Sequence, residues 1–138
     1  MQSETNKHTK IMLKHILFLF FTILLLVIFA LGKKTHYQVT NGYWTGTVNT
    51  GKECLHVAFN LSGDRCEYDC PEQEVYGVAA DVLYRNHDSI CIDIPSVDAQ
   101  AKLTVNQKNG RMRGIFRQEG KTNPIDIGLN DIRTRRHP

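Results

Sequence analysis

The hydrophobic and polar residues of this chain follow two patterns, one on each side of residue 33. Residues 16–32 (ILFLFFTILLLVIFALG) are apolar and carry no charge. A helix of this length spans about 25 Å at ~1.5 Å per residue, and extension back to Ile11 brings it closer to the ~30 Å of a bilayer core. The alternative is a buried core helix, but a domain this small cannot cover such a helix on all sides. The pattern predicts one N-terminal transmembrane or signal helix.

Beyond residue 41, short segments alternate between apolar and polar residues, and turn residues separate them. Strict alternation places every second side chain on one face of a β-strand. The positions that share the apolar face are Trp44, Gly46 and Val48; Leu55, Val57, Phe59 and Leu61; Cys66, Tyr68 and Cys70; Val78, Ala80, Val82 and Tyr84; Ile90, Ile92 and Ile94; Ala99, Ala101, Leu103 and Val105; Met112, Gly114, Phe116 and Gln118; and Ile125, Ile127 and Leu129.

The connections between these segments predict the fold. Turns are expected at residues 49–52, 62–64, 86–88, 109–110 and 119–124, with a longer loop at residues 69–77. Strands joined by short turns form an antiparallel meander. About eight strands with one apolar face each close most naturally into a barrel without sheet edges, and a two-sheet sandwich is the alternative. The expected class is all-β, a lipocalin-like barrel or a sandwich.

Charge next to the apolar segment indicates the direction of insertion. Lys7, Lys10 and Lys14 precede it, and a basic flank keeps the N-terminus in the cytoplasm. The long core favours an uncleaved anchor, whereas small residues favour signal-peptide cleavage near Gly32. The domain then faces the periplasm or exterior, or is secreted. We expect a cytoplasmic N-terminus (1–10), an anchor or signal (11–32), a tether (33–40), a β-domain (41–133) and a basic tail (134–138).

The rest of the chain is nearly neutral. Of 17 basic residues, Lys7, Lys10 and Lys14 lie ahead of the apolar core, as does Glu4 of the 14 acidic ones, so 14 basic and 13 acidic residues remain. A net charge of +1 gives no electrostatic support to nucleic-acid binding. The basic tail is therefore interpreted as a solvated terminus.

The four cysteines, Cys54, Cys66, Cys70 and Cys91, all follow the apolar segment. An even number outside the cytoplasm suggests disulfides. Cys66 and Cys70 are four residues apart in one predicted strand, about 13 Å at ~3.3 Å per residue, whereas a disulfide needs Cα atoms within roughly 7 Å. At most one bridge is expected. A zinc site is not expected, because the chain has no CxxC or HxxxH pair.

Catalytic motifs are missing from the sequence. The serines Ser62, Ser89 and Ser96 have no GxSxG setting, and neither a P-loop nor a dinucleotide fingerprint occurs. Asp69 and Glu72 form a possible carboxylate pair, but acidic residues in a proline-containing loop are usually turn formers. The sequence predicts a domain without catalytic activity or a cofactor.

Four motifs stand out in their order: GYWTG (42–46), DCPEQ (69–73), GIFRQEG (114–120) and PIDIGL (124–129). This order resembles the β-rich N-terminal accessory domain found ahead of the catalytic domain in many exported bacterial α/β-hydrolases. The pattern of that family runs G-x-W-x-G, D-S-P-D-Q-G, G-x-W/F-x-Q-G-G and P-L-x-L. The hydrolase domain has no counterpart here, so the resemblance implies no activity. Gly42-Tyr43-Trp44 also resembles the first strand of lipocalin-type barrels, where the tryptophan plugs one end.

The resemblance suggests which residues to examine. The chain departs from the family pattern at Cys70, Glu72, Glu74 and Glu119, where the family has serine, aspartate, glycine and glycine. The family pattern keeps glutamine at the positions of Gln73 and Gln118. The binding candidates are Asp69, Cys70, Glu72, Gln73 and Gln118, and the structural candidates are Gly42, Trp44, Gly46, Gly114 and Phe116.

Three functions follow as hypotheses. The first is a membrane-anchored, non-catalytic module that binds a protein, a glycan or a lipid-like ligand through the loop at residues 69–77. The second is a lipocalin-like carrier of a small molecule, which needs an open interior lined by Val57, Phe59, Ile92, Leu103 and Phe116. The third is an accessory subunit of a separately encoded α/β-hydrolase.

Overall fold

A computed structural model describes residues 2–31 and 36–130, and these form two units that are considered separately. The first is the helix α1 (Gln2–Leu31), which begins ahead of the expected residue 11 because the polar residues before the apolar core continue the helix. Its segment Asn6–Phe29 is long and apolar enough to cross a membrane, and none of it is buried. The helix is compatible with an anchor and with an export signal.

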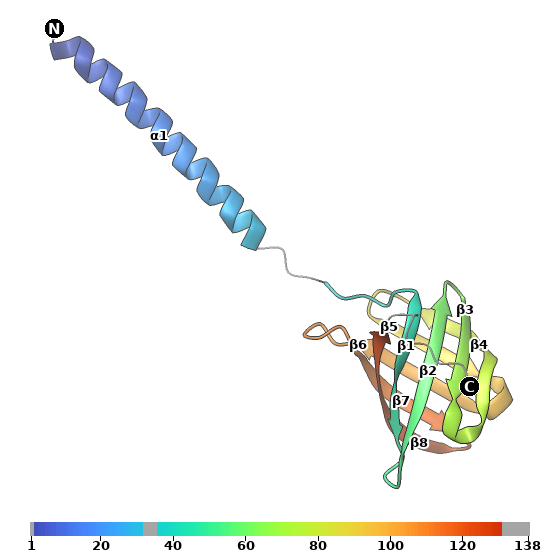
Figure 1. The fold of residues 1–138 in the computed structure, drawn as a ribbon. Coiled ribbons are helices and arrows are strands. Elements are labelled where there is room, and N and C mark those ends of the chain that lie inside the picture. The colour runs from blue at the N-terminus through green and yellow to red at the C-terminus, as the bar shows by residue number, and fades with distance from the viewer. Residues whose placement is uncertain (1, 32–35, 131–138) are drawn as a thin grey trace. The chain divides into compact units, whose positions relative to one another are not determined.

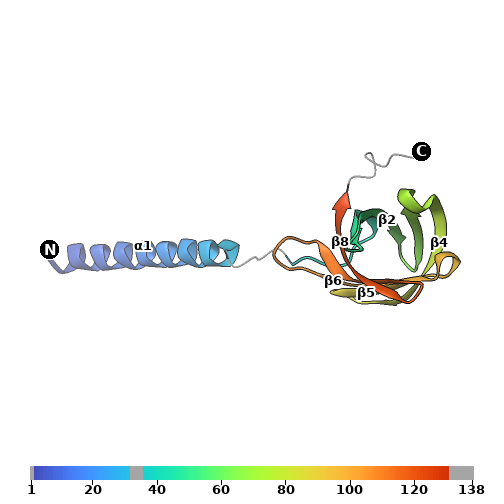
Figure 2. The same cartoon turned by 90° about the horizontal axis from the view of Figure 1, so that it is seen from below.

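The second unit is a closed barrel of eight antiparallel strands that follow one another in sequence order (Figures 1 and 2). The last strand pairs with the first, which closes the barrel. The all-β prediction is confirmed, with the barrel and not the sandwich. The strands are β1 (Gly42–Asn49), β2 (Cys54–Ser62), β3 (Arg65–Cys70), β4 (Val75–Arg85), β5 (Ser89–Ile94), β6 (Ala99–Val105), β7 (Met112–Gln118) and β8 (Lys121–Asn130), with short 3-10 helices η1 (Pro71–Gln73) and η2 (Pro95–Val97).

The predicted apolar faces line the inside of the barrel except at Tyr84 and Leu129, which are exposed. Side chains from all eight strands form one core cluster. In its middle, the ring of Tyr68 lies between those of Phe59 and Phe116, with centroid distances of 5.2 and 6.0 Å. Burying an apolar side chain of this size contributes about 1.5–3 kcal/mol. The alternation seen in the sequence is therefore what fills and stabilises the barrel.

Two glycines allow strands to approach more closely than a side chain would permit. A Cβ added to Gly46 on β1 would lie 1.9 Å from the backbone oxygen of Asp126, and one added to Gly114 on β7 would lie 1.7 Å from that of Lys102. Glycine permits such close backbone contact because it has no Cβ. The structure thus gives both residues a role in packing.

The prediction of a long loop at residues 69–77 is wrong. Strand β3 continues to Cys70, and β4 already begins at Val75. The connection is short because η1 follows β3 directly, with a proline at its first position, and Glu74 ends it in the left-handed conformation with a φ of 58°. A bulge between Tyr68 and Cys70 shifts the register beside it. The connection is therefore a tight turn of residues 71–74.

Two further turns differ from the prediction. The turn expected at residues 119–124 contains only Glu119 and Gly120, with φ values of 50° and 79°, and β8 starts at Lys121. Left-handed geometry at both central residues is typical of a type I′ hairpin. Conversely, the hairpin expected at residues 109–110 spans residues 106–111 and is the longest connection in the barrel.

The alternation of β4 also breaks near its end. Tyr84 is 54% exposed, although it was expected on the inner face. A bulge between Val82 and Tyr84 places Tyr84 opposite Cys91 and Arg85 opposite Ile90. The extra residue moves Tyr84 to the outside and carries Arg85 to the inner side at the barrel end.

All four cysteines are free thiols. Cys66 and Cys70 are buried inside the barrel on the same strand, while Cys54 is exposed and Cys91 half-buried. Burial, with a smaller contribution from the charge of Glu67, raises the pKa of the Cys66 thiol to about 12. The inner thiols therefore stay protonated at neutral pH.

Candidate functional site

The meander places its connections alternately at two ends of the barrel. One end, called the mouth end, carries the turn at residues 50–53, the helices η1 and η2, and the turn at residues 119–120. The other, called the entry end, carries the remaining three connections and the segment at residues 36–41 that leads into β1 (Figure 1). The two ends differ in how their polar side chains are used.

The mouth end contains a hollow of about 440 Å³, called the mouth recess. Val48, Leu55 and Phe116 form its apolar floor, and all three are buried core residues. Gln73 and Gln118 form one wall. The rim carries two positive and two negative side chains, those of Lys52, Lys121, Glu53 and Glu119. The recess therefore combines an apolar base with a polar rim of balanced charge.

The wall of the recess is a pair of glutamine amides. Gln73 Nε2 donates to Gln118 Oε1 at 3.0 Å, and Gln118 Nε2 donates to Gln73 Oε1 at 3.2 Å. Gln118 Nε2 also lies 3.2 Å from the carbonyl oxygen of Val97. These bonds tie η1, η2 and the end of β7 together. The two glutamines singled out from the sequence thus lie side by side at the recess.

Glu72 lies at the same end but forms other contacts. Both of its carboxylate oxygens accept from the backbone N–H of His56 at 3.1 Å, and the imidazole Nδ1 of His56 contacts Oε1. Partial burial by itself raises the pKa of Glu72, but the hydrogen bonds and charge of His56 outweigh it, so the pKa is lowered. This pairing fixes η1 against β2.

Cys70 is buried next to this pair. Its Sγ lies 4.0 Å from Glu72 Oε2, and burial raises the pKa of the thiol even though nearby hydrogen bonds oppose the shift. A nucleophilic cysteine needs a base beside it that lowers its pKa. Here the carboxylate of Glu72 stands next to the thiol, and the imidazole of His56 contacts that carboxylate. This arrangement does not activate the thiol.

Asp69 supports the backbone at the bulge of β3. Its Oδ1 accepts from the backbone N–H of Gly77, and its Oδ2 lies 3.5 Å from the hydroxyl of Tyr43. Asp69, Cys70 and Glu72 do not line the mouth recess. Of the five predicted binding residues, the structure brings only Gln73 and Gln118 to it.

The charged rim was not predicted from the sequence. Lys52 and Glu53 belong to the β1–β2 turn, and Glu119 and Lys121 lie at the β7–β8 turn, more than sixty positions later. The sequence did contain a signal for this rim, because one positive and one negative residue lie at each of the two turns. Only the closure of β1 on β8 brings the two turns to the same rim.

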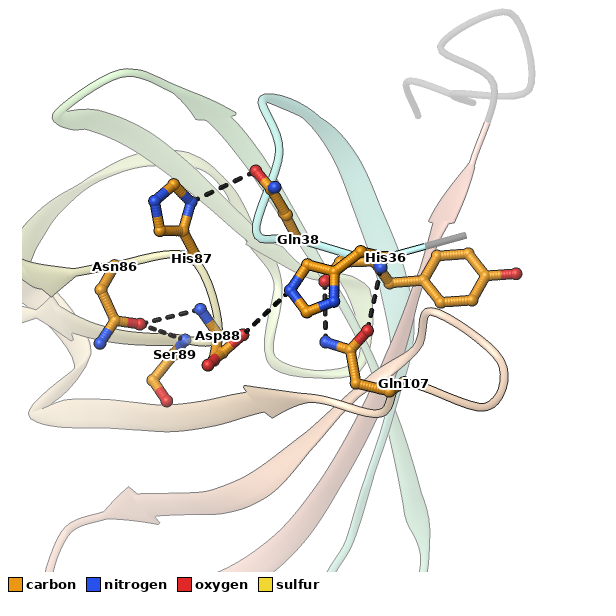
Figure 3. A network of polar contacts seen from close by, with 8 residues as sticks. His36, Gln38, Asn86, His87, Asp88, Ser89 and Gln107 are labelled. Atoms are coloured by element: carbon orange, nitrogen blue, oxygen red, sulfur yellow. Dashed lines mark hydrogen bonds and ion pairs between the residues drawn. The ribbon is translucent and has the colours of Figure 1, made fainter. Parts of the chain in front are cut away.

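At the entry end, polar side chains hold the incoming chain in place (Figure 3). The Gln107 amide forms two hydrogen bonds with the backbone of Tyr37, of 3.0 and 2.8 Å. His36 Nε2 lies 4.0 Å from Asp88 Oδ1, and His87 Nδ1 lies 3.3 Å from Gln38 Oε1. The segment before β1 is thereby fixed to two turns of the barrel.

Two large side chains close the entry end. Trp44 is 2% exposed, and its indole N–H donates to the carbonyl oxygen of Thr40 at 2.9 Å. Arg85 donates to Asn41 Oδ1, to the carbonyl oxygen of Gly63 and to that of Val39, at 2.9, 2.8 and 3.1 Å. A second hollow of about 440 Å³ lies at this end, but of the inner core residues it reaches only Trp44.

Comparisons with protein families, with curated proteins and with solved structures find no significant match to this chain. Within residues 2–31 and 36–130, no three His, Cys, Asp or Glu side chains come together where they could hold a metal ion. The geometry of the mouth recess is therefore the basis for proposing a function.

Proposed function

We propose that the barrel is a non-catalytic binding module that an N-terminal helix anchors at, or exports across, the cytoplasmic membrane, and that its mouth recess binds a small neutral amphipathic ligand. The observation that carries this proposal is the recess itself, with the apolar floor of Val48, Leu55 and Phe116 under a polar rim. The basic residues before the helix core support an extracytoplasmic barrel.

The composition of the recess favours a neutral ligand. Small-molecule sites are usually apolar hollows of roughly 300–1,000 Å³ with a few polar groups that orient the ligand. The volume of about 440 Å³ falls in this range. The rim charges of Lys52, Glu53, Glu119 and Lys121 cancel, so the rim does not attract ions of one sign.

The ligand is expected at the mouth and not deep in the barrel. A carrier with an open interior would need space around residues such as Val57, Ile92 and Leu103. These side chains are at most 3% exposed. The rings of Phe59, Tyr68 and Phe116 pack against one another inside the barrel, the first pair tilted and the second stacked. The role as an accessory subunit of a hydrolase stays a prediction.

A recess-filling variant tests the proposal. Asn123 lies opposite Phe116 in the β7–β8 register and lines the recess, whereas the neighbouring Thr122 is exposed on the other face of β8. The full chain in lipid nanodiscs, labelled at Leu and Val methyl groups, is titrated with acetophenone and with ethylbenzene, and empty nanodiscs measure partition into lipid. We expect saturable shifts of the Val48 and Leu55 methyl signals, which Asn123→Trp abolishes and Thr122→Trp leaves unchanged. Absence of saturable shifts in the unmodified protein would refute the proposal.

A further inference from the structure

One polar group lies inside the barrel without a hydrogen-bond partner. Tyr68 is fully buried, and its hydroxyl has no partner among the residues that the structure describes. The core around it is apolar, and none of the buried residues described is charged. Buried hydroxyls are almost always hydrogen-bonded in folded proteins, so an unsatisfied one calls for a partner from outside the chain.

The neighbours of this hydroxyl show which way it faces. Burial raises the pKa of Tyr68 most, the neighbouring Cys70 side chain raises it further through electrostatics and a hydrogen-bonding contact, and the charges of Glu72 and Asp69 add to the shift. Cys70 ends β3 and Glu72 lies in η1 at the mouth end, so groups that act on the hydroxyl lie toward that half of the barrel. The Cys70 thiol lies within reach of the hydroxyl, but their contact falls short of regular hydrogen-bond geometry and sulfur is a weak acceptor. The phenol therefore stays protonated and available as a donor.

Phe116 connects the hydroxyl with the mouth recess. Its ring forms part of the recess floor and stacks on the ring of Tyr68, with a centroid distance of 6.0 Å. The recess floor and the Tyr68 ring thus share the side chain of Phe116.

We infer that Tyr68 donates a hydrogen bond to a ligand that enters through the mouth recess, and that this ligand carries a neutral oxygen acceptor such as a ketone, ester or amide carbonyl on an apolar body. A carboxylate is disfavoured because the described core offers no cation to compensate its charge. This inference rests on the proposed function and adds the chemical class of the ligand.

Three probes of similar size test the inference on the full chain in nanodiscs. Acetophenone has a carbonyl oxygen, ethylbenzene has none, and benzoate carries a charge. Binding is followed through the ζ-carbon signal of ¹³C-labelled tyrosine, with Tyr68 assigned from Tyr68→Phe. Tyr76→Phe serves as the matched control, because Tyr76 is 45% exposed on the outside of β4.

We expect acetophenone to bind about fivefold more tightly than ethylbenzene and to shift the Tyr68 signal, since one hydrogen bond of about 1 kcal/mol changes affinity by roughly that factor. Benzoate should bind least. Tyr68→Phe should make acetophenone and ethylbenzene equal, whereas Tyr76→Phe should preserve the difference. If Tyr68→Phe binds acetophenone as tightly as the unmodified protein, the inference is wrong while the recess remains a binding site. If neither neutral probe binds, the recess and the inference fail together.

Discussion

The two ends of the barrel use polar side chains in opposite ways. At the entry end, the amides, histidines and Arg85 are bonded to the incoming segment at residues 36–41 or to turn backbone. At the mouth end, the rim charges of Lys52, Glu53, Glu119 and Lys121 form no ion pair with any described residue. The entry end uses its polar side chains for internal bonds, whereas the mouth end combines such bonds at Gln73, Gln118 and Glu72 with a charged rim whose side chains have none among the described residues. The difference shows where substitutions should be costly and where they should not.

The largest expected effect is at the entry end. Trp44→Ala removes a buried side chain that plugs the barrel and an N–H bond to Thr40, and we expect it to lower the free energy of unfolding by about 3–5 kcal/mol. Urea unfolding followed by circular dichroism measures the change. At the mouth end, Lys52→Ala should stay within about 0.5 kcal/mol of the unmodified protein. Comparable losses in the two variants would contradict the contrast between the ends.

A smaller effect is expected from the amide pair of the mouth. Gln73→Ala or Gln118→Ala should each lower the free energy of unfolding by about 0.5–1.5 kcal/mol, because each removes the same reciprocal hydrogen bonds. In a double-mutant cycle the two losses should not add. Gln100→Ala, a half-buried glutamine on the outer face of β6, serves as the comparison. Additive losses would show that the pair does not act as a unit.

The smallest expected effect depends on pH. The folded-state pKa of Glu72 lies below its ordinary value of 4.5, so its ionised form is favoured by folding. This contribution is present above the unfolded-state pKa and is lost as the pH falls through the folded-state pKa. Glu72→Gln should therefore cost about 0.5–1 kcal/mol at pH 7 and less at about pH 3. Unfolding curves at both pH values, with Asp69→Asn alongside, measure the difference.

Much of the barrel could be predicted because its signal is local. The alternation at Ile90, Ile92 and Ile94 assigns a strand and its inner face without knowledge of any neighbour, and all three side chains are buried. The path of β4 could not be predicted in the same way. Its bulge before Tyr84 is set by pairing with β5, and a one-residue shift there reverses which side chains face inward.

The candidate site depended still more on distant contacts. Gln73 and Gln118 were singled out through a family resemblance, and only the fold shows that they bond to each other across 45 positions of sequence. Asp69, Cys70 and Glu72 were assigned to one loop, but Asp69 and Cys70 end the strand β3 and Glu72 lies in η1. Asp69 binds the backbone of Gly77, whereas Glu72 pairs with His56. A motif in sequence therefore brought together residues of the mouth end, but it did not separate those that line the recess from those that support the backbone.

The pairing of β1 with β8 also has a consequence for how the chain is made. Synthesis begins at the N-terminus, so β1 (Gly42–Asn49) emerges first and its partner β8 (Lys121–Asn130) last. Pairing between distant segments is slow, and an unpaired strand edge is prone to join other chains. Every newly made chain therefore passes through a stage in which the edge of β1 that pairs with β8 is unpaired. Its yield is therefore expected to depend on chaperones that cover β1 until the final strand arrives.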